Sequence, residues 1–210
     1  MPSWTSLALF AAASIALLVV PGPSVLYVIT RSVSQGRRAG LISVLGVHVG
    51  SVVHVTAAAL GLSALLASSA TAFAAVKYLG AGYLIWLGIQ KLRHSVPGPL
   101  DDVPAVGRGQ LFTQGVVVNV LNPKTAIFFL AFLPQFVNPE RGPVAVQIIV
   151  LGVCFIALGV VSDGGYALLA GSISGHIRRT DRARRRLGRA SGVVYLGLGA
   201  GAALAGPSTP

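Results

Sequence analysis

Long apolar runs that contain almost no charged residue constrain this chain more than any other feature. Five such runs are Thr5–Thr30, Ala39–Val76, Leu111–Pro139, Gly142–Ile177 and Ala190–Pro210. Together they hold only two charged residues, Lys124 and Asp163. Charged residues make up 10% of the chain, against roughly 25% in soluble domains. A helix that crosses a membrane needs about 20 mostly apolar residues, so the runs predict a polytopic membrane protein.

The runs divide into six predicted membrane spans. Within lipid, backbone N–H and C=O groups must bond to one another, and a helix achieves this within a single segment. We therefore predict an all-α integral membrane protein with six transmembrane helices. The predicted spans are Thr5–Ile29, Leu41–Leu65, Ala72–Gln90, Leu111–Phe136, Val144–Gly171 and Ala190–Gly206.

The basic residues between the predicted spans lie mostly on one side. Thirteen fall in the loops after spans one, three and five, whereas only Arg141 falls in the loops on the other side. Cytoplasmic loops carry such an excess, which predicts a multi-pass protein of the cytoplasmic (inner) membrane with both termini outside. The net charge of +11 is then explained without nucleic acid. The arginine-rich loop Arg178–Arg189 is expected to contact anionic lipid headgroups.

The two halves of the chain show weak internal similarity in the same order. Three pairs of segments match: Pro21–Ser24 with Asn122–Thr125, aligned through Pro23 and Pro123 at an offset of 100 residues, Val44–Val47 with Val150–Val153 at 106, and Lys77–Leu84 with Arg189–Leu196 at 112. Because each half has three spans, the second would enter the membrane from the opposite face. We predict one transporter domain over residues 1–210, with an inverted repeat at about 5–90, a cytoplasmic linker at about 91–110 and a second repeat at about 111–206.

Each repeat has a helix break in its first span. Proline interrupts a helix but fits its first turn, so a new helix is expected to begin at Pro23 in Pro21-Gly22-Pro23-Ser24, and another at Pro123 in Asn122-Pro123-Lys124. The two new helices would point in opposite directions, with their positive ends converging on a common centre that attracts an anionic group. The alternative is a pair of proline kinks that only shape the bundle, with Lys124 snorkelling.

These elements resemble a known family. The run from Val20 to Gly50, the segment VKYLGAGYLIWLGIQKLR and the run VNVLNPKTAIFFLAFLPQFV together resemble the lysine exporter (LysE/RhtB) family of bacterial amino-acid exporters. The resemblance covers nearly the whole chain. It implies a small six-span secondary carrier that exports amino acids or their derivatives using the proton gradient. The chain departs from the family pattern at Ser24, where many members have Asn, so the family substrates do not transfer directly.

Ionisable side chains inside spans are costly and are therefore functional candidates. Asp163 is the only carboxylate within a span and is our first candidate for proton coupling, with Lys124 or His54 as the neighbours expected to influence it. His54 is the second candidate, because histidine titrates near neutral pH. A packing role is the expectation for His48. Asn119, with Asn122 and the residues of the two breaks, is expected to line the substrate pathway.

Other functional classes have less support. One cysteine, Cys154, allows neither a disulfide nor paired-thiol redox chemistry within the chain. Enzyme signatures and nucleotide-binding loops are absent, so we predict neither an enzyme nor a cofactor. No metal site is predicted, although efflux of another small metabolite or a divalent metal ion is the alternative function. Six short spans are few for a complete pathway, so a homodimer is left open, as is Na⁺ in place of H⁺.

Overall fold

The computed structural model describes residues 1–68 and 105–172, together with positions 78, 82, 85, 86 and 89. Apart from those single positions, the predicted spans at 72–90 and 190–206 lie outside the described residues, as does the arginine-rich loop. Within the described ranges every regular element is a helix.

The first predicted span consists of two helices, α1 (Trp4–Val19) and α2 (Pro23–Gln35), with a bend of 51° between them. The α-helix cannot continue through Pro21, which has no N–H for the carbonyl of Leu17. A new helix begins at Pro23, where the missing N–H would have had no partner inside α2. The predicted break and restart in this span are confirmed.

The fourth predicted span is also broken, with a bend of 47°. Its helices are α5 (Arg108–Val120), α6 (Pro123–Ile127), the π-helix η1 (Phe128–Phe132) and the 3₁₀-helix η2 (Leu133–Phe136). Asn122 caps α6 by accepting the Lys124 N–H at 3.1 Å, as the sequence predicts. The change to π and 3₁₀ geometry occurs where Pro134 has no N–H to donate to the previous turn.

Two unbroken helices complete the described bundle, α3 (Arg37–Ser68) and α7 (Val144–Ser172), the latter preceded by a 3₁₀ turn, η3 (Pro139–Arg141). Both are long and apolar enough to cross a membrane, and the described residues hold up to four spans if each bent pair counts as one. Large apolar side chains such as Leu60 and Val161 point outward, as they do on a lipid-facing surface.

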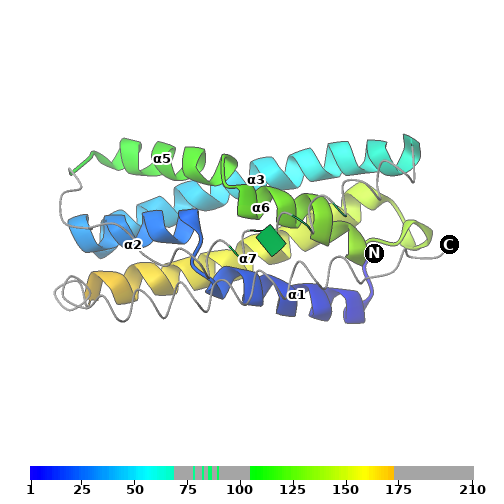
Figure 1. The fold of residues 1–210 in the computed structure, drawn as a ribbon, viewed down its shortest axis with the longest axis horizontal. Coiled ribbons are helices and arrows are strands. Elements are labelled where there is room, and N and C mark those ends of the chain that lie inside the picture. The colour runs from blue at the N-terminus through cyan, green and yellow to red at the C-terminus, as the bar shows by residue number, and fades with distance from the viewer. Residues whose placement is uncertain (69–77, 79–81, 83–84, 87–88, 90–104, 173–210) are drawn as a thin grey trace.

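The helices form an elongated bundle in which the two breaks meet near the middle (Figure 1). Along the long axis α1 and α2 run in one direction, whereas α5 and α6 run in the other. Glycines allow close packing between α3 and α5. A Cβ on Gly46 would lie 2.2 Å from the Phe112 carbonyl oxygen, and one on Gly115 would lie 2.8 Å from that of Ser43. Gly46 and Gly115 therefore allow the two helices to pack closely.

Candidate functional site

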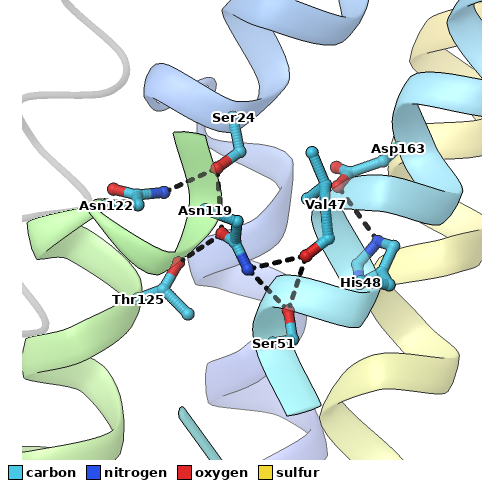
Figure 2. Close-up of polar contacts among 8 residues, drawn as sticks. All are labelled: Ser24, Val47, His48, Ser51, Asn119, Asn122, Thr125 and Asp163. Atoms are coloured by element: carbon cyan, nitrogen blue, oxygen red, sulfur yellow. Dashed lines mark hydrogen bonds and ion pairs between the residues drawn. The ribbon is translucent and has the colours of Figure 1, made fainter. Parts of the chain in front are cut away.

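The starts of α2 and α6 are joined by hydrogen bonds at the centre of the bundle (Figure 2). The Asn122 side-chain amide donates to Ser24 Oγ at 2.8 Å, and that hydroxyl donates to Asn119 Oδ1 at 2.9 Å. All three side chains are buried. The first turns of two helices that run in opposite directions therefore meet, as the sequence analysis expected for the two breaks.

Asn119, near the end of α5, connects four elements. Its Nδ2 donates to the Val47 carbonyl at 2.8 Å and to Ser51 Oγ at 2.9 Å, both on α3. Its Oδ1 accepts from Ser24 of α2 and, at 3.2 Å, from Thr125 Oγ1 of α6. Both N–H donors and both acceptor positions of the amide are thus used. A fully satisfied buried amide fixes the relative positions of the helices around it.

Each proline at the breaks leaves a carbonyl four residues earlier without its helical donor. The structure supplies a side chain from another span to each of these carbonyls. Lys124 contacts the Leu17 carbonyl, which lies four residues before Pro21. Tyr166 contacts the Val19 carbonyl, four residues before Pro23. His54 contacts the Asn119 carbonyl, four residues before Pro123. The Leu17 and Asn119 carbonyls also accept a backbone N–H three residues further on, from Val20 at 3.2 Å and from Asn122 at 3.0 Å. The cross-span side chains therefore add to these local bonds, in agreement with the rule that backbone groups at membrane depth must be satisfied.

Lys124 is the most polar of these donors and is only 6% exposed. Its Nζ lies 2.7 Å from the Leu17 oxygen and 2.6 Å from the Val20 oxygen. These carbonyls form the negative end of α1, where a cation is favoured. The sequence predicts that Lys124 lies beside the positive end of the helix that begins at Pro123. In the structure its ammonium group contacts carbonyl oxygens at the negative end of α1.

Asp163 pairs with a histidine that the sequence analysis assigned to packing. His48 Nε2 lies 3.1 Å from Asp163 Oδ2, and both side chains are buried. The imidazole fits because α7 has glycine beside it: a Cβ on Gly159 would lie 2.3 Å from His48 Cε1. His54, the histidine that was the candidate for proton coupling, instead has its Nε2 2.8 Å from the Asn119 carbonyl oxygen. No sequence signal separated the two histidines, because only their helical rotation decides which one faces α7.

Polar and apolar side chains line a small cavity of about 20 Å³, which is room for about one water molecule. Of the predicted pathway residues, Gly22, Ser24, Asn119, Asn122 and Lys124 line it, as does Asp163. The other lining residues are Leu17, Leu18, Val25, Val47, His48, Ser51, Thr125 and Phe155. Pro23 and Pro123 lie on the outside of the bundle, where they shape the breaks. In this conformation the cavity is too small for an amino acid.

Aromatic packing closes one side of the cavity. Phe155 lines the cavity and packs against Phe128 and Phe129, with ring centroids 5.2 and 5.0 Å away. Toward the other end of the bundle, two turns beyond Ser24, the buried Arg31 donates to Gln114 Oε1 at 2.9 Å and so ties α2 to α5.

Comparison with known proteins agrees with this architecture. The family model of the LysE type translocators matches residues 15–206. The homoserine/homoserine lactone efflux protein of Salmonella typhimurium is 35% identical over 185 residues, which are 88% of this chain and 89% of the relative. An uncharacterized membrane protein of Vibrio cholerae is 32% identical over 182 residues, 86% of this chain and 88% of the relative.

A further relative is the membrane protein YrhP of Bacillus subtilis, 32% identical over 155 residues, which are 69% of this chain and 73% of that protein. No solved structure matches the chain significantly. The family model extends over most of the chain, including both helix breaks and the residues that line the cavity. Its members are membrane translocators and not enzymes. The chain belongs to the LysE type translocator family.

Proposed function

We propose that the protein is a secondary exporter of amino acids or close derivatives across the bacterial cytoplasmic membrane, driven by proton antiport. The observation that carries the proposal is a cavity lined by polar side chains at the meeting point of two broken helices, within an otherwise apolar bundle. A relative named as a homoserine/homoserine lactone efflux protein makes homoserine and its lactone the first substrates to test.

The cavity offers complementary groups for a zwitterion. Amide and hydroxyl groups of Ser24, Asn119 and Asn122 lie at the positive ends of α2 and α6, where a substrate carboxylate is favoured. Lys124 adds a positive charge at the same centre. Asp163 is the carboxylate in the described lining, and we assign to it the substrate amine or the proton. We assign His54 a supporting position, because its partner is the backbone of α5.

Alternating access would follow from an inverted repeat. Pro23 and Pro123, which are 100 residues apart, occupy the first position of their helices and lie on the outside, while Ser24 and Lys124 after them are buried. This correspondence supports two repeats that rock around the central cavity. The excess of arginine in the loops supports external termini, with Arg178–Arg189 against anionic headgroups in the cytoplasm.

Release of amino acids from intact cells tests the function. Bacteria that express the protein are loaded with a mixture of dipeptides that includes homoserine-containing peptides, and released amino acids are quantified by mass spectrometry. We expect faster release of one or a few amino acids than from cells with empty vector, and its suppression by Lys124→Ala and by a protonophore. Val161→Ala, on the outward face, is the matched variant for expression. Profiles identical to empty vector, with the protein in the membrane, would contradict export of amino acids.

A further inference from the structure

The pair formed by His48 and Asp163 retains unused hydrogen-bonding capacity. The two side chains are 5% and 2% exposed, and Nε2 lies 3.1 Å from Oδ2. This contact does not have the alignment of a hydrogen bond, and neither His48 Nδ1 nor Asp163 Oδ1 has a hydrogen-bond partner among the described residues. A buried polar atom without a hydrogen-bond partner is unfavourable, because it has lost its bonds to water. Since both side chains line the cavity, a bound polar group can satisfy them.

Three of the described residues that line the cavity are ionisable. Among the described lining residues, the ionisable ones are His48 from α3, Lys124 from α6 and Asp163 from α7, while α1, α2 and α5 supply none. The Lys124 ammonium donates hydrogen bonds to the carbonyl oxygens of Leu17 and Val20. Within the described part of the chain, the ion pair recorded for this carboxylate is with the imidazole of His48.

Nearby titratable groups just outside the lining have backbone partners. His54, further along α3, lies on the Asn119 carbonyl. Tyr166, one turn after Asp163 on α7, donates to the Val19 carbonyl at 2.6 Å. On α2, Tyr27 donates to the Leu111 carbonyl at 2.7 Å. These partners leave His48 as the group best placed to exchange a proton beside Asp163.

We propose that the protonated imidazole of His48 and the ammonium group of the substrate compete for the carboxylate of Asp163, which makes His48 the proton-carrying residue of the antiport. The inference deepens the proposed function and rests on it. Before substrate binds, the site holds an imidazolium and a carboxylate. When the substrate ammonium reaches Oδ1, Nε2 releases one proton and the imidazole becomes neutral. The carboxylate faces one cation in both states, so proton and substrate are exchanged one for one.

This competition requires an imidazole that can leave and regain the carboxylate, and Gly159 provides the space for it. The glycine lies one turn before Asp163 on the same face of α7, directly against the ring. The substrate class follows from the same geometry. A transported molecule needs a cationic amine to contact Asp163, so an N-acylated amino acid is rejected. Its carboxylate is bound elsewhere in the cavity and does not take part in the competition, so an amino-acid lactone or amide is accepted.

Two measurements on the full-length purified protein test the proposal, with homoserine as the probe. The first is exchange of labelled for unlabelled homoserine in proteoliposomes at equal pH, which requires no net proton movement. The second is accumulation of homoserine in proteoliposomes with an acidic interior, which requires coupling. We compare wild type with His48→Gln, and with His54→Gln as the rival histidine on the same helix.

We expect His48→Gln to lose accumulation by a larger factor than it loses exchange, and His54→Gln to keep a dependence of accumulation on the pH gradient. Loss of coupling in His54→Gln but not in His48→Gln overturns the proposal. Wild-type protein that exchanges no homoserine or other amino acid overturns the proposed function itself, so the two failures are distinguishable.

A measurement on wild type alone covers the case in which His48→Gln does not fold. Homoserine is added to detergent-solubilised protein in weakly buffered solution containing a pH indicator. We expect release of about one proton per bound homoserine at a pH where the imidazole is protonated, and none on addition of N-acetylhomoserine. Homoserine binding without proton release at any pH between about 5 and 8 overturns the proposal.

Discussion

The ammonium of Lys124 lies 2.7 Å from the carbonyl oxygen of Leu17, the carbonyl that Pro21 deprives of its helical donor. A residue of the second broken span thus completes the backbone of the first. The arrangement explains how a chain places a helix breaker and a charge in the same apolar run. The break creates a carbonyl end at membrane depth, and the charge satisfies it.

Replacement of Lys124 by methionine is expected to destabilise the protein, because the Val20 carbonyl loses its side-chain donor and the Leu17 carbonyl keeps only the Val20 N–H at 3.2 Å. We expect a cost of about 1–3 kcal/mol, measured by unfolding of the purified protein in detergent. Adding Pro21→Ala restores an N–H that can bond to Leu17, so the double variant should recover part of the loss. Strictly additive effects of Lys124→Met and Pro21→Ala would contradict this explanation.

Tyr166→Phe tests the second proline carbonyl. It removes the donor to Val19, whose helical partner would be Pro23, and we expect a lower unfolding midpoint that corresponds to about 1 kcal/mol. The matched control is Tyr27→Phe, which also removes a phenol-to-carbonyl bond, but from a residue inside α5 whose helical N–H donor is intact. Equal losses in the two variants would count against a special role for the proline carbonyls.

Asn119→Ala should loosen the junction of the four helices more than the loss of any one partner. The amide makes four side-chain bonds, whereas Ser51→Ala removes only one of them. We expect about 2 kcal/mol or more for Asn119→Ala and about 1 kcal/mol or less for Ser51→Ala. Thermal unfolding with and without homoserine measures both variants. A smaller loss for Asn119→Ala than for Ser51→Ala would contradict the central position of the amide.

Gly159→Ala should displace the His48 imidazole, because the new Cβ would lie 2.3 Å from Cε1. We expect the rate of coupled transport to fall about tenfold or more. A tenfold change corresponds to about 1.4 kcal/mol. Gly164→Ala on the same helix is the matched control, since nothing described lies within 4 Å of its Cβ position. A normal rate in Gly159→Ala would show that the ring position does not matter for transport.

Local backbone rules were sufficient to predict the broken helices. Pro21, Pro23 and Pro123 act through a missing N–H, and Asn122 caps the helix that begins at the next residue, so sequence alone located these features. Runs of apolar residues were likewise sufficient for the described spans, because helix length and apolar composition are properties of single segments.

Pairings between helices were harder to predict. His48 and His54 lie six residues apart on α3, so they point in different directions, and nothing in the sequence says which direction faces α7. The target of Lys124 was also missed, because it depends on where the end of α1 lies relative to α6. Tyr166 gave no signal as a donor, since its partner carbonyl is identified only when Val19 and α7 are placed together.

The central claim is that the protein exchanges an amino acid or derivative for protons. Its most direct test is accumulation of labelled homoserine by proteoliposomes that contain the purified protein and have an acidic interior. We predict accumulation above the external concentration, abolished by a protonophore and by Asp163→Asn. Equilibration that never exceeds the external concentration, or accumulation unaffected by the protonophore, would contradict proton antiport as the mechanism.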